Sequence, residues 1–256
     1  GATPAGAALS VVERFDPAAH AWQEVEPMRS PRYLAVAGEL RGRLYVVGGH
    51  STSRPHLGGS RRLVASPAWH DTGLPMLNSV EAFKACSNCW CHVQPMQHDR
   101  VLACAVVVGA RLYVLGGLSR AFGVLQSAEC LDVDSGQWQM LPPMVHKRCA
   151  AVAAASPDGR VYICGGNGSA RYTGECRAVE RFDPGASAWE SLRPCCILRN
   201  FASAAVAGGH LYVWGGKRGS EPLQHVERLD LEEGCWEVLP PMRCARNGSC
   251  GIALSG

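Results

Sequence analysis

Residues 44–49 read Leu-Tyr-Val-Val-Gly-Gly, and closely related phrases return at residues 112–117, 161–166 and 211–216. Each phrase joins a run of strand-forming residues to a pair of glycines. Self-similarity at an interval of about 50 residues is typical of propellers and other repeat arrays. The chain therefore uses one structural unit four times.

Each unit contains four short stretches rich in β-branched and aromatic residues, separated by Gly, Pro, Asp and Asn. This pattern predicts strands joined by turns. In the third unit we expect strands at 149–155, 161–164, 179–182 and 189–192. A four-stranded sheet of this size buries its faces only by packing against its neighbours around an axis, so the sequence predicts an all-β propeller.

The glycine pair and a recurring tryptophan have structural explanations. Directly after the second strand the backbone leaves the crowded interior, and glycine tolerates a turn and a close approach that a Cβ would block. The tryptophan that opens the fourth strand is a large wedge between twisted sheets. These tryptophans are Trp22, Trp90, Trp138, Trp189 and Trp236.

Doubled glycines after the second strand, a tyrosine shortly before them and a tryptophan beyond them resemble the kelch repeat over nearly the whole chain. Two departures occur: Pro194-Cys195 replaces Pro-Met, and Phe83-Lys84-Ala85 replaces the Phe-Asp-Pro of residues 15–17. The resemblance implies a kelch β-propeller, with six blades as the common number and five as an alternative.

We expect four complete four-stranded blades and a partial blade split between the termini, as in a fragment of a five- or six-bladed propeller. Sharing one blade between the ends would remove a free edge. The expected divisions are a partial blade at 11–28, blades at 29–96, 97–144, 145–195 and 196–242, and the first strand of a further blade at 243–256.

The blade at 29–96 carries an insertion at 50–77, about 20 residues longer than the matching connections. Its prolines, glycines and arginines, among them Arg54, Arg61 and Arg62, favour a mobile, basic loop. It is either a tolerated surface insertion or a loop that overhangs the binding face.

Arginine stands four residues after every Pro-Met or Pro-Cys landmark, which places it in the connection between the fourth strand of one blade and the first strand of the next. Radial repetition would turn this spacing into a basic ring able to bind carboxylates. Alternatively, the arginines bond backbone carbonyls of an adjacent blade. The candidate partner-binding residues are Arg32, Tyr33, His98, Arg100, His146, Arg148, Arg199, Asn200, Arg246 and Asn247.

A net charge of +3 does not indicate nucleic-acid binding, and apolar runs such as 102–108 are much shorter than the ~20 residues of a membrane-spanning helix. The chain has thirteen cysteines, an odd number that does not follow the repeat, and we expect most of them to be buried thiols in a reducing, cytoplasmic setting. The spacing of Cys86, Cys89, Cys91 and His92 is metal-like. Because side chains alternate along a strand, however, we expect no metal and no cofactor.

The leading functional hypothesis is a non-enzymatic interaction module. Resemblance to kelch proteins implies that an acidic peptide segment of a partner binds the loop face, and that further domains connect the propeller to a cullin-type ubiquitin ligase. Two alternatives stay open. One is a galactose-oxidase-like propeller enzyme, and the other is a kelch scaffold that binds actin.

Overall fold

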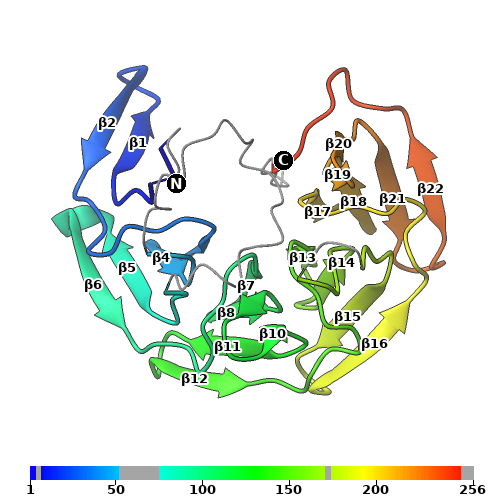
Figure 1. Ribbon diagram of the computed structural model, residues 1–256, viewed down its shortest axis with the longest axis horizontal. Coiled ribbons are helices and arrows are strands. Elements are labelled where there is room, and N and C mark those ends of the chain that lie inside the picture. The colour runs from blue at the N-terminus through cyan, green and yellow to red at the C-terminus, as the bar shows by residue number, and fades with distance from the viewer. Residues whose placement is uncertain (4–6, 52–74, 171–173, 249–256) are drawn as a thin grey trace.

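The computed structural model describes residues 1–3, 7–51, 75–170 and 174–248, which form an open ring of antiparallel sheets (Figure 1). Four sheets have four strands each, and their strands pair in chain order from the axis outward. The predicted all-β propeller with four complete blades is therefore confirmed.

The four blades, named A to D in chain order, have the following strands. Blade A contains β3 (Val36–Leu40), β4 (Arg43–Val47), β5 (Val80–Lys84) and β6 (Cys89–Val93). Blade B contains β7 (Cys104–Val108), β8 (Arg111–Leu115), β11 (Ala128–Asp132) and β12 (Gln137–Met140). Blade C contains β13 (Val152–Ala155), β14 (Val161–Cys164), β15 (Val179–Asp183) and β16 (Ala188–Leu192). Blade D contains β17 (Ser203–Ala207), β18 (His210–Trp214), β21 (Val226–Asp230) and β22 (Trp236–Leu239).

Smaller elements decorate the ring. Strands β1 (Val12–Asp16) and β2 (Ala21–Val25) form a two-stranded sheet at one end of the arc, and a 3-10 turn, η2 (Ala85–Ser87), joins β5 to β6. Two short hairpins extend from the connections between the second and third strands of blades B and D. The sequence did not predict these hairpins, which are β9 (Leu118–Ser119) with β10 (Gly123–Val124), and β19 (Lys217–Arg218) with β20 (Glu221–Pro222).

The first strand of blade C begins at Val152 rather than at residue 149. Cys149 instead forms a single bridge with Asn167, and Ala150 has a left-handed backbone with φ of +52°. Leu34, Leu102 and Phe201, each two residues beyond a candidate arginine, adopt the same conformation. Each blade thus makes a tight turn before its first strand, which shortens that strand.

These turns connect the blades around the axis. The N–H of Ala150 donates to the carbonyl of Leu102 at 2.9 Å, and the N–H of Phe201 donates to the carbonyl of Ala150 at 2.9 Å. The innermost strands β3, β7, β13 and β17 also lie side by side. Backbone hydrogen bonds and strand packing therefore fix each blade relative to the next.

The core consists of apolar layers between adjacent blades. Leu112 and Val114 of blade B, for example, are fully buried and pack with Val47 and Val80 of blade A. The recurring tryptophans connect blades in a second way, because the indole N–H of Trp138 donates to the carbonyl of Gln94 at 2.7 Å. Trp90, Trp189 and Trp236 make the equivalent bond.

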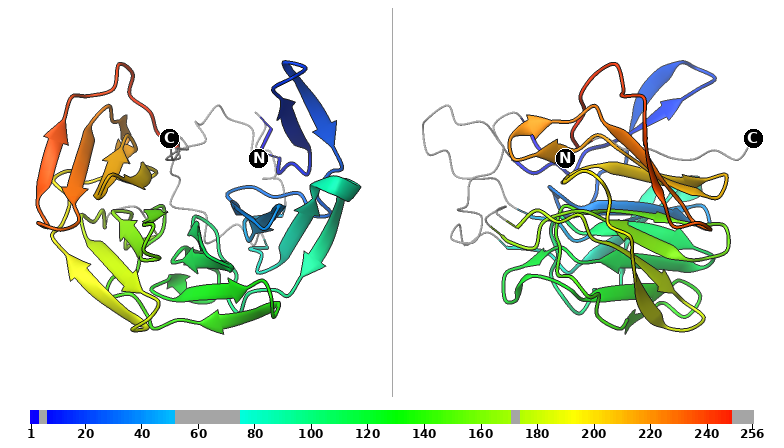
Figure 2. Two further views of the ribbon diagram at one scale, coloured as in Figure 1. Left: turned by 180° about the vertical axis from the view of Figure 1, so that it is seen from behind. Right: turned by 90° about the vertical axis from the view of Figure 1, so that its right-hand side faces the viewer.

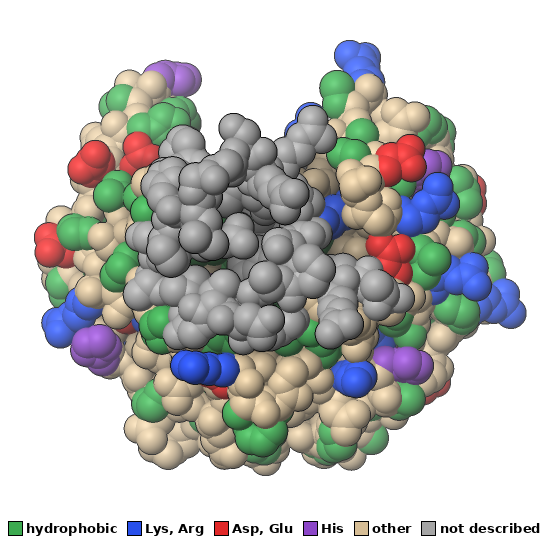
Figure 3. Space-filling model, viewed as in Figure 1, with side chains coloured by type: hydrophobic (Ala, Val, Ile, Leu, Met, Phe, Trp, Pro, Cys, Tyr) green, Lys and Arg blue, Asp and Glu red, His purple; other side chains and the backbone are tan. Residues whose placement is uncertain are grey.

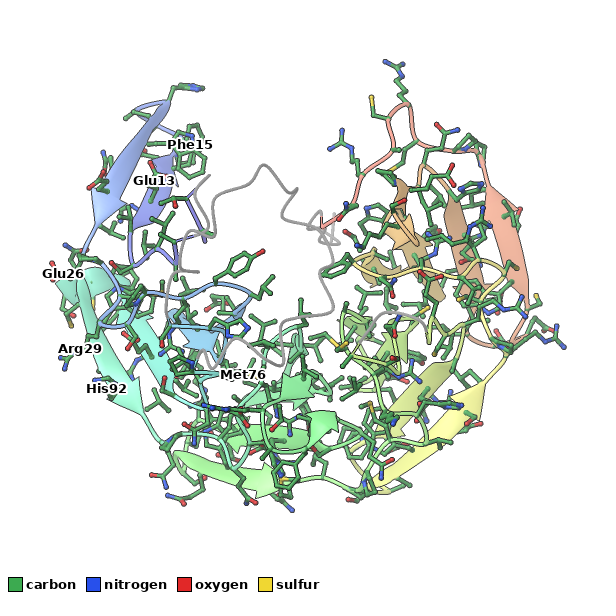
Figure 4. The ribbon with its side chains drawn as sticks, in the orientation of Figure 1. Glu13, Phe15, Glu26, Arg29, Met76 and His92 are labelled. Carbon is green, nitrogen blue, oxygen red and sulfur yellow. The ribbon has the colours of Figure 1, made fainter. Side chains whose placement is uncertain are left out.

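The β1–β2 sheet has exposed faces where the complete blades are buried. Phe15 and Trp22 are 43% and 67% exposed, whereas their counterparts in blade A, Phe83 and Trp90, are 8% and 3% exposed. Figure 2 shows the arc open on this side, and Figure 4 shows Glu13 and Phe15 on β1. Strands β1 and β2 lie within the partial blade expected at 11–28. The first strand of a further blade was expected at 243–256, and residues 249–256 of that range lie outside the described residues.

In the described part of the chain, no helix is long and apolar enough to cross a membrane.

Candidate functional site: a braced rim

The candidate arginines of the four complete blades form one repeated buried structure. Arg100 donates from Nη2 to the Glu129 carboxylate at 2.9 Å, and from Nη1 to the carbonyls of Gly116 and Ser127 at 2.6 and 2.9 Å. We call this arginine–glutamate pair with its two carbonyl contacts a brace. The other braces are Arg32 with Glu81, Arg148 with Glu180, and Arg199 with Glu227.

The brace glutamate accepts hydrogen bonds from the arginine and also from backbone N–H groups of the connection that leads into the blade. The carboxylate of Glu129 accepts backbone N–H groups from Gln97 and His98 at 2.7 and 3.2 Å. Glu81 and Glu180 accept two such groups each, and Glu227 accepts one from Cys196. One buried carboxylate therefore fixes both the arginine side chain and the backbone that precedes it.

The glycine pair of each blade contacts the backbone of the brace arginine that belongs to the next blade. The N–H of Gly117 donates to the Arg148 carbonyl at 2.9 Å. A Cβ on Gly116, which has φ of +60°, would lie 2.3 Å from the same oxygen. Both reasons proposed for the doubled glycines, a turn and a close approach, are observed at this point.

These contacts correct the expectation that the arginines present a basic ring to a partner. Arg32, Arg100, Arg148 and Arg199 are no more than 1% exposed, and the carboxylate that each guanidinium binds belongs to its own blade. The structural alternative is observed only in part, because the arginines bond backbone carbonyls of their own blade rather than of an adjacent blade. Their carboxylate partners were not foreseen.

The surroundings of Glu81 show how a buried brace carboxyl stays ionised. Burial alone would raise the pKa of this carboxyl, but hydrogen bonds from Arg32 and from the Arg29 N–H hold the pKa below its ordinary value. Burial lowers the pKa of Arg100, an effect that Glu129 opposes. Each charge therefore depends on its partner to offset burial.

Other candidate residues are accessible on the same rim. His146 is half-exposed, with Nδ1 3.2 Å from a Glu180 oxygen, and His98 is partly exposed, with Nδ1 3.5 Å from Glu129. Tyr33 is partly buried and pairs with His50, which follows the glycine pair of blade A. This bridge confirms that the two kinds of connection share one rim.

The remaining candidate residues, Asn200, Arg246 and Asn247, differ in their exposure to solvent. Asn200 is buried, contrary to a role as an open partner contact, and its amide donates to Glu175 at 3.1 Å. Arg246 and Asn247 are exposed beyond blade D. Arg246 nevertheless keeps the backbone role of a brace arginine, because its carbonyl accepts the Gly216 N–H at 2.8 Å.

The β9–β10 hairpin adds an exposed aromatic residue to this rim. Phe122 at its tip is 67% exposed and contacts the His98 ring edge-on, with ring centroids 5.1 Å apart. Asp99 fixes the hairpin by accepting the Ser119 hydroxyl at 2.6 Å and the Arg120 N–H at 3.0 Å. The rim therefore presents an exposed aromatic side chain beside a histidine.

Figure 3 views the face that carries these connections, with basic and acidic side chains distributed around it. The basic insertion expected at 50–77 falls largely at 52–74, outside the described residues. Cys86, Cys89 and Cys91 are exposed, free thiols. Within the described ranges, no three His, Cys, Asp or Glu residues gather in a way that could hold a metal ion.

Sequence reasoning missed the four brace glutamates, although a signal for them was present. Each lies second in a phrase such as Val-Glu-Arg-Phe-Asp at 179–183, which recurs in the third strand of every blade. A charged residue at an otherwise apolar strand position indicates a buried ionic partner. Glu13 occupies this position in β1, where it is exposed.

Comparisons with known proteins agree with the repeat. The family model described as Kelch motif matches residues 99–145, 148–195 and 198–243, more than half of the chain. Kelch-like protein 35 of Mus musculus is 25% identical over 232 residues, which cover 90% of this chain and 35% of that protein. Kelch-like protein 34 of Homo sapiens is 28% identical over 90% of this chain and 34% of its own length. Beta-scruin of Limulus polyphemus is 26% identical over 95% of this chain and 26% of its own length.

The chain thus spans about a third of the length of the kelch-like relatives it matches. A solved structure titled "Structure of YjhT" superposes with a TM-score of 0.73 at 14% identity, covering 98% of this chain and 88% of that one. This likeness shows the fold alone. Taken with the braced four-stranded blades, the three motif matches show that the chain belongs to the Kelch motif family.

Proposed function

We propose that this ring is a non-enzymatic, protein-binding module that holds an acidic peptide segment of a partner on the rim formed by the blade-to-blade connections. The observation that carries the proposal is a constant brace beside accessible side chains that differ from blade to blade. Near the buried arginines the rim presents the partly exposed Tyr33 and His98 and the half-exposed His146, whereas Val101, Cys149 and Asn200 are buried. Repeat proteins bind partners through such variation on a fixed scaffold.

The exposed charges on blades B and C favour an acidic partner. Arg120 and Lys147 are exposed, and His98 and His146 lie close to them in the chain. The nearby Glu129 and Glu180 are buried in braces, and Asp99 already accepts two hydrogen bonds. The cationic groups on this part of the rim are therefore more available to a partner than the acidic ones.

In a full-length protein, we propose that the ring selects the substrate of a cullin-type ubiquitin ligase in the cytoplasm. The support is the similarity to kelch-like proteins about three times as long as this chain. Co-purification of the full-length protein with a cullin tests this part. Its failure would leave the peptide-binding proposal standing.

The rim proposal is tested with peptides selected from a random display library on the purified ring. We expect the selected peptides to be rich in Asp and Glu, and to bind more weakly as salt is added. Arg120→Ala and His146→Ala should each weaken binding, whereas Arg43→Ala on the opposite rim should not. Selected peptides that bind all three variants equally would refute the proposal.

A further inference from the structure

Every complete blade packs two equivalent side chains near its glycine pair. One precedes the glycines, and the other follows the landmark proline after the fourth strand. In blades A and B these pairs are Val47 with Met96 and Leu115 with Met144, each within one apolar cluster. Among the four described blades, blade C alone has cysteine at both positions. They are Cys164 and Cys195, and both are buried in a shared cluster.

The backbone brings these two cysteines to the same place. Cys164 lies opposite Val179 in the β14–β15 ladder, and the next residue, Gly165, donates its N–H to the Ala178 carbonyl at 3.1 Å. The N–H of Cys195 donates to the Arg177 carbonyl at 3.0 Å. Both cysteines are therefore anchored on three consecutive residues and lie in one apolar cluster, where the Cys195 thiol also donates to the Ile197 carbonyl at 3.2 Å.

We propose that Cys164 and Cys195 are an oxidation site that forms an intramolecular disulfide with hydrogen peroxide as the oxidant. The Cys195 sulfur attacks one peroxide oxygen, the O–O bond breaks, and the released hydroxide leaves as water after taking the thiol proton. The Cys164 sulfur then displaces the hydroxyl of the resulting sulfenic acid as a second water. Two thiols are oxidised and one peroxide is reduced to two waters.

The surroundings of the two thiols indicate which sulfur reacts first with the peroxide. The neighbouring Cys164 thiol lowers the pKa of the Cys195 thiol, while the Cys195 thiol and burial raise the pKa of Cys164. Because the thiolate is the nucleophile, Cys195 is the first sulfur to react and Cys164 the second. Burial of both sulfurs makes the reaction slower than at the exposed neighbour Cys196.

The disulfide would connect an inner strand to the rim. Cys164 ends β14, and Cys195 lies four residues before Arg199, the brace arginine of blade D. A cross-link between residues 164 and 195 would restrict the unfolded chain and fix the connection from blade C to blade D. Oxidation would therefore stiffen one sector of the rim.

The test exposes the folded protein to hydrogen peroxide, blocks the remaining thiols, digests without reductant and identifies linked peptides by mass spectrometry. We expect the Cys164 peptide joined to the Cys195 peptide, with a mass loss of about 2 Da that a reductant reverses. The oxidised protein should also melt a few degrees above the reduced protein.

Two variants provide the controls. Cys195→Met introduces the residue found in the sister blades, so the chain should fold but form no linkage at Cys164. Cys196→Ser removes the adjacent exposed thiol and should leave the linkage intact. The proposal is overturned if Cys195 couples to Cys196 instead, or if both buried thiols stay free under conditions that fully oxidise Cys196. It is equally overturned if the linkage forms only after unfolding in urea.

Discussion

Removing one arginine from a brace should cost far more stability than removing an arginine from the surface. Arg100→Met keeps most of the apolar stem but deletes the guanidinium contacts with Glu129, Gly116 and Ser127. The Glu129 carboxylate is 0% exposed and would lose the guanidinium that pairs with it, which leaves the His98 ring, at 3.5 Å, as its neighbour. Breaking a buried pair in this way costs about 3–5 kcal/mol in the free energy of unfolding.

The assay is urea unfolding of the wild type and three variants. Arg111→Met is the matched control, because its ion pair with Asp132 is 3.5 Å long and half-exposed, so it should cost less than ~1 kcal/mol. Adding Glu129→Gln to Arg100→Met should recover part of the loss by removing the stranded charge. Equal, small losses for Arg100→Met and Arg111→Met would refute the structural role of the brace.

Three further perturbations test the same framework. First, because the pKa of Glu81 is depressed in the fold, its contribution to stability is present above the unfolded value of about 4.3 and is lost as pH falls through the lower folded value. Urea unfolding between neutral and acidic pH should therefore show a component that Glu81→Gln removes; an unchanged pH profile would contradict the pairing. Second, Gly116→Ala should destabilise by about 2 kcal/mol or more beyond Gly109→Ala, since both glycines have positive φ but only Gly116 faces a carbonyl at 2.3 Å; equal melting temperatures would count against the close approach. Third, Trp138→Phe should cost about 1 kcal/mol in chemical unfolding by losing the indole bond to Gln94, and no loss would show that the bond does not connect the blades.

The strands could be predicted closely because the repeat has strong local signals. The second strand of blade C was expected at 161–164, and β14 has those bounds. The first strand of blade C was expected to begin before its observed start because a left-handed turn at Ala150 precedes it. The four blades have Leu, Ala or Phe at this turn, and these residues do not indicate a turn in the sequence. Glycine, which would have signalled such a turn, stands at other points of the repeat.

The sequence shows the regular spacing of the arginines but not their burial in pairs with glutamate. Their spacing after Pro-Met is local, whereas their glutamate partners lie 28 to 49 residues away in another strand. A local pattern cannot reveal that a cation is already neutralised by a distant residue. The variable neighbours Tyr33, His98 and His146 are the accessible part of the expected site, and their binding role stays a prediction.

The rim consists of buried braces, which maintain the fold, and of accessible side chains, which we propose bind a partner. One experiment measures both properties in adjacent residues: peptide affinity and urea stability for Arg148→Lys and His146→Ala. An ammonium cannot reproduce the forked contacts of the Arg148 guanidinium with Glu180 and two carbonyls. We predict that Arg148→Lys lowers stability but leaves the affinity of the folded protein for a selected acidic peptide unchanged, whereas His146→Ala lowers affinity at unchanged stability. The reverse pattern, with affinity lost at Arg148 and retained at His146, would contradict the account.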